Sequence, residues 1–446
     1  MTPWPPRPAG WVAVTWPTWG SSHWLGRLGG DVLTGSRRPS RNADVRRILI
    51  ARGSRGLASG YFAVVLGVEL HGQGLSGVEV GLILGAVLGG TALALEGVRR
   101  FADAAGRRRL YGYGYLLQAL AAVVLVLSPW WWLLVAVGLT GVLATETVDS
   151  GAFGALEQVM LASAVAESTR LRSFSVYGAV GAAAGASGAL GAGLLELAGP
   201  GSVGRSSFLA IVPLALVGAA YAFRLSPAVE HSGTAQARDR RDPGSAETRR
   251  TIRRISSLFA LDSLGAGFAV QAFVAYWLAA RFHATTLTIG AIFLATGLLQ
   301  TLSMMVAGRL GERFGLLETM VFTHLPSNVF LAAIAFAPSL PVAALLLCLR
   351  ASLSEMDVPT RNAYLMALVP ARDRTEAAST TGLARLLARP LGPPLAGLVQ
   401  GVAIGAPFLF SGVLKGVYDL SLWLWFRRVP LGDEFGSNAT RNADSE

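Results

Sequence analysis

Apolar and polar residues alternate in blocks along most of this chain of 446 residues. Each apolar block holds about 20 residues, the length at which an α-helix crosses a bilayer core of about 30 Å. Short polar segments separate the blocks, so the pattern predicts an all-α membrane protein. The predicted transmembrane helices number twelve and lie at about 46–70, 76–98, 107–128, 130–151, 172–196, 206–226, 253–280, 286–309, 316–337, 341–363, 376–402 and 404–426.

A polar segment over 227–251 divides the twelve predicted spans into two sets of six. It is charged and contains Pro and Gly, which is typical of a linker between two bundles. An ungapped internal repeat supports the division, because 157–194 aligns with 361–398 at the junction of the fourth and fifth spans of each half. We therefore expect two pseudo-symmetric six-helix bundles over 44–226 and 252–428, with a disordered tail over 1–43 and a second tail over 429–446.

Composition and charge agree with a membrane protein. Apolar residues make up 52% of the chain and charged residues 15%, and the mean hydropathy is +0.49. The net charge of +11 comes from basic clusters that occupy every second connection, which is the positive-inside pattern and not the footprint of a nucleic-acid-binding surface. We expect a bacterial inner-membrane protein with both termini in the cytoplasm, in contact with anionic lipids and not with nucleic acid.

Two connections share an acid followed three residues later by a glycine. They are "RRFADAAGRRR" over 99–109, with Asp103 and Gly106, and "GRLGERFG" over 308–315, with Glu312 and Gly315. A short turn between antiparallel helices needs the permissive backbone of glycine, and the acid can accept from amides at the start of the next helix.

These two connections resemble the loop signature of the major facilitator superfamily. The second copy matches that signature from Gly308 through Glu312, Arg313 and Gly315. The first keeps Asp103, Gly106, Arg107 and Arg108 but has Arg99 at the leading glycine and Ala104 at the basic position. "THLPSN" over 323–328 and "EMDVPTRNAYLMALVPARDRTEAAST" over 355–380 are similar to stretches of bacterial permeases of this superfamily, a branch described as drug or metabolite transporters.

The resemblance implies the superfamily fold and a carrier that exposes a central site alternately to each side of the membrane. We therefore expect a secondary active transporter of a small solute, proton-coupled, with export as an open alternative, acting as a monomer without a metal or other cofactor. The fifth predicted helix has glycines but lacks the glycine-proline signature of drug antiporters. The gate residues that the resemblance implies in the loops are Asp103, Arg107 and Glu312.

Asp357 and Arg361 lie four residues apart where the tenth predicted helix ends, so they share a helix face. Pro359 between them is expected to bend or end that helix. Two interpretations stay open: a local ion pair that anchors the helix at the interface, or part of a cytoplasmic gate whose partners exchange during transport.

Ionisable residues deeper in the predicted spans indicate function, because an intramembrane charge is costly. Arginines that converge on a central cavity, which we expect helices one, four, seven and ten to line, would suit an anionic substrate. The alternative is an internal network in which Arg350 pairs with Glu146 or Asp149, and buried carboxyls are candidate proton sites. The substrate and coupling candidates are Arg52, Arg55, Glu146, Asp149, Asp262, Arg350 and Arg385, and further charges lie at Glu157 and Arg389.

Other function classes have little support in the sequence. Lys415 is the only lysine and lies in the twelfth predicted helix, so the chain has no phosphate-binding loop of a pump, and we expect an ion pair between Lys415 and Asp419. Neither an H-E-x-x-H pair nor a G-x-S-x-G sequence occurs, and we expect no enzyme activity. An intramembrane enzyme and a transporter-derived sensor remain as alternatives.

Overall fold

The computed structural model describes residues 39–127, 130–146, 151–166, 169–199, 203–230 and 246–427. Nearly all of these residues are helical and none forms a strand. The first half comprises α2 (Pro39–Gly72), α3 (Gly77–Ala105), α4 (Arg107–Leu127), α5 (Trp131–Leu139), α6 (Gly151–Ala164), α7 (Arg170–Leu194) and α8 (Ile211–Phe223), with short 3₁₀ turns η2 (Leu195–Ala198), η3 (Arg205–Ala210) and η4 (Pro227–Glu230).

The second half repeats this order of helices. It comprises α9 (Ala246–Phe268), α10 (Gln271–Phe282), α11 (Thr286–Phe314), α12 (Leu316–Ile334), α13 (Leu340–Ser354), α14 (Asp357–Leu368), α15 (Arg374–Ala388), α16 (Gly392–Gln400) and α17 (Ala406–Phe426), with η5 (Ala371–Asp373) and η6 (Arg389–Leu391). Six helical segments of the described residues are long and apolar enough to cross a membrane. α2 begins inside the segment 1–43 that we assigned to a tail, and α9 begins inside the expected linker.

Four of the predicted continuous spans are broken. In the fourth, α5 ends at Leu139 and α6 begins only at Gly151, the last residue of the predicted span. The seventh divides into α9 and α10, the tenth into α13 and α14, and the eleventh into α15 and α16 through η6. Pro359 explains the break in the tenth span, since its ring would clash with the carbonyl of Glu355, four residues earlier in a continuous helix. The fourth and tenth spans are equivalent in the internal repeat, so their breaks are part of the pseudo-symmetry.

Gly141 accounts for the end of α5 within the predicted fourth span. Its φ of +70° lies in the left-handed region, and a Cβ there would lie 2.1 Å from the carbonyl oxygen of Gly90 in α3. Only glycine fits this conformation and this approach. The chain therefore ends α5 at Leu139 and continues without helix through Glu146.

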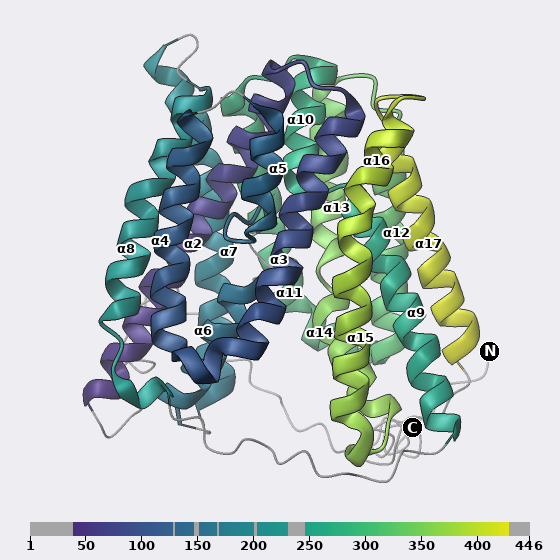
Figure 1. The fold of residues 1–446 in the computed structure, drawn as a ribbon. Helices are drawn as coiled ribbons and strands as arrows, with labels where there is room; N and C mark the ends of the chain where they lie inside the picture. Colours follow the sequence, from purple (N-terminus) through teal and green to yellow (C-terminus); the bar gives the residue numbers. More distant parts are fainter. Residues whose placement is uncertain are drawn as a thin grey trace, which may run out of the picture.

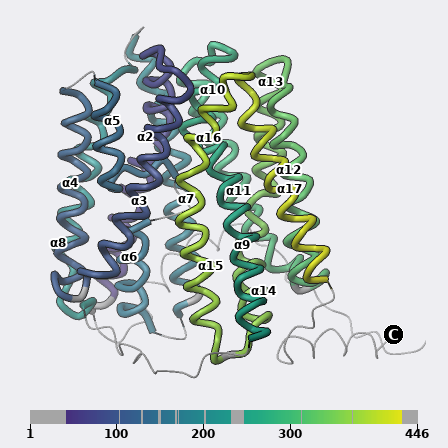
Figure 2. Tube along the Cα trace, turned by 45° about the vertical axis from the view of Figure 1, so that its right-hand side comes forward, coloured from purple at the N-terminus to yellow at the C-terminus, as the bar shows by residue number. Residues whose placement is uncertain are grey.

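The two halves meet at one end of the molecule and diverge toward the other (Figure 1). At the closed end, helix pairs from opposite halves pack against each other: α2 with α10, α3 with α16, and α7 with α11. Gly77 and Gly397 face each other so closely that a Cβ on Gly397 would lie 2.1 Å from the Gly77 carbonyl oxygen. The turned view places α16 between α3 and α17 at this end, and α14 and α15 at the opposite end (Figure 2).

A larger side chain at Gly397 is expected to force the closed end apart. We predict that Gly397→Val increases maleimide labelling of Ala272→Cys, a buried position where α10 packs against α2, several-fold in a Cys348→Ser background. Gly416→Val is the matched control, because a Cβ at Gly416 meets no atom within 4 Å. Folded Gly397→Val protein with unchanged labelling would contradict this role of the glycine contact.

Candidate functional site

A central cavity of about 340 Å³ lies between the two halves. Most of its wall comes from α9, α10, α11, α13 and α14, and α7, α12, α15, α17 and the chain between α5 and α6 complete it. The prediction that the seventh and tenth spans line the cavity is confirmed, but the first span contributes nothing to its lining, and Glu146 is the one lining residue among the described residues of the fourth. Its charged lining residues are Glu146, Asp262, Arg350, Glu355, Asp357, Arg361, Arg385, Arg389 and Lys415.

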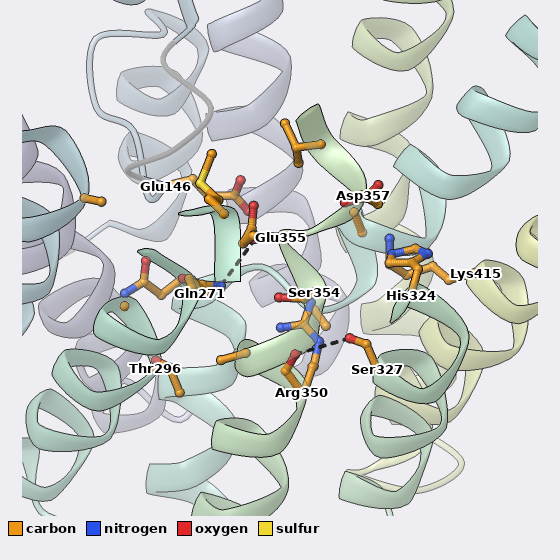
Figure 3. Close-up of a pocket in the computed structure, with 18 of the residues that line it drawn as sticks. Glu146, Gln271, Thr296, His324, Ser327, Arg350, Ser354, Glu355, Asp357 and Lys415 are labelled. Atoms are coloured by element: carbon orange, nitrogen blue, oxygen red, sulfur yellow. Dashed lines mark hydrogen bonds between the residues drawn. The ribbon is translucent and has the colours of Figure 1, made fainter. Parts of the chain in front are cut away.

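Arg350 projects from the last turn and a half of α13 into this cavity (Figure 3). Its backbone oxygen accepts from Ser327 Oγ of α12 at 3.3 Å, whereas its guanidinium Nε has no hydrogen-bond partner. No carboxylate of the described residues forms an ion pair with it within 4 Å, and the expected partner Glu146 is bound to Arg389. Asp149, the other expected partner, lies outside the described residues. A buried guanidinium that lacks an ion-pair partner can accept a charge from a ligand.

Glu355 is a cavity residue that our reading of the sequence did not select. It lies in the break between α13 and α14, and its Oε1 accepts a long hydrogen bond of 3.4 Å from Gln300 Nε2. Within the described part of the chain no cation pairs with it at 4 Å or less. The sequence shows Glu355 two residues before Asp357 and four before Pro359, but it does not show that the break between α13 and α14 turns Glu355 into the cavity.

Asp262 is the centre of a buried ion network in the second half. It lies in α9, accepts from Lys415 Nζ and from Arg361 Nη1 at 3.3 Å, and has His324 Nε2 at 4.0 Å. Arg361 also donates to Asp357 Oδ2 at 2.8 Å. The predicted ion pair between Asp357 and Arg361 is therefore confirmed, and both residues are buried beside the cavity.

The expected ion pair within the twelfth helix does not form. Lys415 turns to Asp262, and Asp419 instead accepts from Asn328 Nδ2 at 2.8 Å and contacts His324 Nδ1 at 2.8 Å. Pairs between helices replace the pair within one helix because Lys415 and Asp419 are both buried in the bundle, where each can reach a fixed partner. The i,i+4 spacing that predicted the pair carries no information about neighbouring helices.

Glu157 is the centre of a matching network in the first half. Arg55 donates to both carboxylate oxygens, at 3.1 and 2.5 Å, and the Tyr111 and Tyr177 hydroxyls donate at 2.6 and 2.5 Å. Arg52 lies over the Tyr177 ring at 4.9 Å. Arg52 and Arg55 are both buried in α2 but do not line the central cavity, so they are part of the internal-network alternative and not of the predicted substrate site.

The two networks occupy equivalent positions with the charges exchanged. The internal repeat aligns Glu157 with Arg361, and each meets a residue of opposite charge from the first helix of its half: Arg55 in α2 and Asp262 in α9. The third span of each half adds polar groups one turn apart, Tyr111 and Tyr115 in α4 and His324 and Asn328 in α12. In each half, a buried ion pair thus connects the first span to the fourth and stabilises the bundle.

One ion pair crosses between the halves. Glu146, in the non-helical chain after α5, accepts from Arg389 of η6, and Arg385 donates to Ser263 Oγ of α9 at 3.2 Å. Arg385 and Arg389 both line the central cavity as expected. Among the ion pairs of the described residues, Glu146–Arg389 is the one that connects the first half to the second.

The first signature loop is attached to its own half. Gly106 has φ +84°, Arg107 donates its backbone N–H to Glu230 Oε2 at 3.1 Å, and Arg108 Nη1 donates to the Leu225 carbonyl at 2.9 Å. Glu230 and Leu225 follow the sixth span, so these contacts do not reach the facing half. In the second loop Gly315 has φ +97° and starts α12, Arg313 lies over the Phe314 ring at 5.3 Å, and a Cβ on Gly308 would meet nothing within 4 Å. The side chains of Asp103 and Glu312 lie outside the described residues.

Comparison with protein families matches the chain to the model of the Major Facilitator Superfamily over residues 48–279 and 255–443. The chain therefore belongs to this superfamily and is a membrane transporter of its type, with twelve spans in two pseudo-symmetric bundles. An uncharacterized membrane protein of Saccharomyces cerevisiae, YJR124C, is 25% identical over 410 residues, which covers 84% of this chain and 92% of the yeast protein.

Solved structures of several transporters share the fold. The nucleoside transporter NupG is 12% identical with a TM-score of 0.65, covering 86% of this chain and 99% of NupG. A bacterial homologue of the iron transporter ferroportin in an inward-facing state is 17% identical with a TM-score of 0.64, covering 85% and 98% of the two chains. The human organic anion transporter MFSD10 is 17% identical with a TM-score of 0.57, covering 86% and 100%.

Loss of one member of a buried ion pair is expected to lower the stability of the protein more than loss of one member of an exposed pair. We predict that Glu157→Gln lowers the free energy of unfolding by about 3–5 kcal/mol, because it leaves the buried Arg55 guanidinium without its carboxylate. Glu96→Gln is the control, since its partners Arg99 and Arg100 are exposed, and it should lower the free energy of unfolding far less than Glu157→Gln does. Thermal unfolding of the purified protein in detergent gives the measurement.

Exchange of the pair provides the complementary test. The double variant Arg55→Glu with Glu157→Arg should recover part of the loss, because it restores opposite charges between α2 and α6. Equal stability of Glu157→Gln and Glu96→Gln would contradict a structural role for the Arg55–Glu157 pair.

Proposed function

We propose that this protein is a secondary active transporter that moves a small organic anion by alternating access. The observation that carries the proposal is Arg350, whose buried guanidinium faces the central cavity without an ion-pair partner among the described residues. Four of the five cations that line the cavity have side-chain partners in the structure: Arg361, Arg385, Arg389 and Lys415. A carboxylate or phosphate on a substrate would complete the coordination of Arg350 with bidentate geometry.

The cavity has a size suited to a small solute. Its volume of about 340 Å³ falls at the lower end of ordinary ligand sites, about 300–1,000 Å³. Thr296, Gln300, Ser327 and Asn328 add polar groups from α11 and α12. These groups would orient a substrate whose charge is bound by Arg350.

We place the divergent end of the molecule in the cytoplasm of a bacterial inner membrane, with both termini on that side and the protein acting as a monomer. The basic connections over 99–109, 170–172 and 372–374 follow the positive-inside rule at this end. In this orientation the packed pairs α2–α10, α3–α16 and α7–α11 form the periplasmic seal. The structure would then represent a state that is open toward the cytoplasm.

We propose proton coupling through Glu355, which joins Asp262 and Glu146 as a candidate. Asp262 is bound by Lys415 and Arg361, and Glu146 by Arg389, so protonation of either would break an ion pair. Protonation of Glu355 would break none within the described residues. Its place in the break after α13 lets it exchange protons close to the Arg350 site.

Removal of the charge at Arg350 tests the anion site. We predict that Arg350→Gln lowers anion uptake by proteoliposomes by about tenfold or more, and that Arg350→Lys retains part of it because charge persists without the planar fork. Arg281→Gln is the control, since Arg281 is exposed in the last turn of α10 and lies outside the cavity. Unchanged uptake by well-folded Arg350→Gln protein would overturn the proposal.

Removal of the acid at Glu355 tests coupling separately from binding. We predict that Glu355→Gln abolishes acceleration of uptake by an imposed pH gradient while substrate exchange across the membrane continues, because exchange requires no net proton movement. Flux of the labelled anion with and without the gradient measures both activities in one preparation. A variant that responds to the gradient like the wild type would exclude Glu355 as the coupling site.

A further inference from the structure

A second cavity adjoins the first and has a different character. It is a lateral cleft of about 870 Å³ between α3 and α6 of the first half and α15 of the second. Glu146, Ser263, Arg385 and Arg389 line both this lateral cleft and the central cavity, so the two spaces are contiguous. Figure 1 shows α15 standing apart from α3 and α6, below the contact of α3 with α16.

The walls of the lateral cleft are largely apolar. Leu88 and Leu95 of α3 and Leu386 of α15 line it, and it includes two side chains that are substantially exposed, Val159 of α6 at 40% and Leu383 of α15 at 55%. The cleft opens between two helices of a membrane protein. An apolar groove in this position favours hydrocarbon over water.

Charge is concentrated at the two ends of this apolar wall. Arg385 and Arg389 lie at the inner end, next to the central cavity, and Arg99 and Arg107 lie near the end of α3 and the start of α4. The carboxylates of the lining are Glu96, which pairs with Arg99, and Glu146, which pairs with Arg389, so the lining contains two more guanidinium groups than carboxylates. The cleft therefore complements a molecule that joins an anionic group to an alkyl chain.

We propose that the lateral cleft binds a single-chain anionic amphiphile drawn from the bilayer, with its head group at Arg385 and Arg389 and its alkyl chain between α3 and α15. The lateral cleft has a larger volume than the central cavity and is contiguous with it. The alkyl chain therefore remains in the cleft while the head group moves from Arg385 and Arg389 toward Arg350. Movement of the head group to Arg350 rests on the proposed function, because it makes an amphiphilic anion the substrate of the transporter. Binding in the cleft is a separate property that can be measured without transport.

The test uses the full-length protein in nanodiscs of zwitterionic phosphatidylcholine, with laurate as the probe. In a Cys348→Ser background, a bimane fluorophore on Val159→Cys reports on the cleft, and one on Leu216→Cys, exposed on α8 away from it, is the control. We expect a saturable response to laurate at Val159→Cys alone and no saturable response to dodecylamine. Affinity should rise by about fourfold per added methylene from octanoate to laurate.

Two kinds of variant test the space in the cleft and its positive charge separately. Leu383→Trp should lower laurate affinity by filling the cleft, whereas Leu420→Trp on α17, of similar exposure, should not. Arg389→Gln together with Arg385→Gln should lower it about tenfold. Equal binding of dodecylamine and laurate, or identical responses at Val159→Cys and Leu216→Cys, would overturn the proposal.

Transport measurements distinguish failure of this inference from failure of the proposed function. Short-chain anion uptake without saturable laurate binding would leave the transporter proposal standing and refute the cleft as an amphiphile site. Laurate binding without uptake of any anion would support the site and refute the proposed transport of anions.

Discussion

The structure depends on the cost of a charge that is buried in the membrane without a partner, a cost that one ion pair within each half avoids. An unpaired ion in a low-dielectric interior costs several kcal/mol or more, and removal of one partner of a buried pair costs about 3–5 kcal/mol. These pairs, Arg55–Glu157 in the first half and Asp262–Arg361 in the second, lie at equivalent positions with exchanged sign. Each pair joins the first span of its half to the fourth, so each bundle can move as a rigid body while the interface between them changes.

Breaks in the spans put the remaining polar groups where the two bundles meet. Glu146 enters the interface because α5 ends before the chain reaches it, and Glu355 because Pro359 ends α13. The backbone at these breaks lines a cavity, which is where irregular structure is tolerated at membrane depth. Besides the glycine contacts at the closed end, Glu146–Arg389 is the one ion pair between the halves in the part of the chain that the structure describes, which leaves the opposite end free to open.

Hydropathy was sufficient to predict the twelve spans, and the loop signature and internal repeat were sufficient for the fold, because both depend on patterns local to the chain. The break in the seventh span was not predictable, since the apolar residues Ala269 and Val270 continue through it, whereas the fourth span contains polar residues such as Thr145 and Glu146 after α5. The Lys415–Asp419 prediction was wrong because spacing along one helix says nothing about α9 and α12. For the same reason the sequence did not single out Glu355, and it could not show that Arg52 and Arg55 lie outside the cavity. The charges of Arg350, Arg385 and Arg389 had nevertheless indicated an interior site.

Flux through the wild-type protein tests the central claim most directly. Proteoliposomes under an imposed pH gradient would be offered small organic anions and cationic dyes in parallel, with protein-free liposomes as the reference. The account predicts saturable, gradient-accelerated movement of an anion, because the central cavity contains Arg350 with no ion-pair partner among the described residues. Movement of cationic dyes with no movement of any anion would contradict it and would assign the buried arginines to the internal network alone.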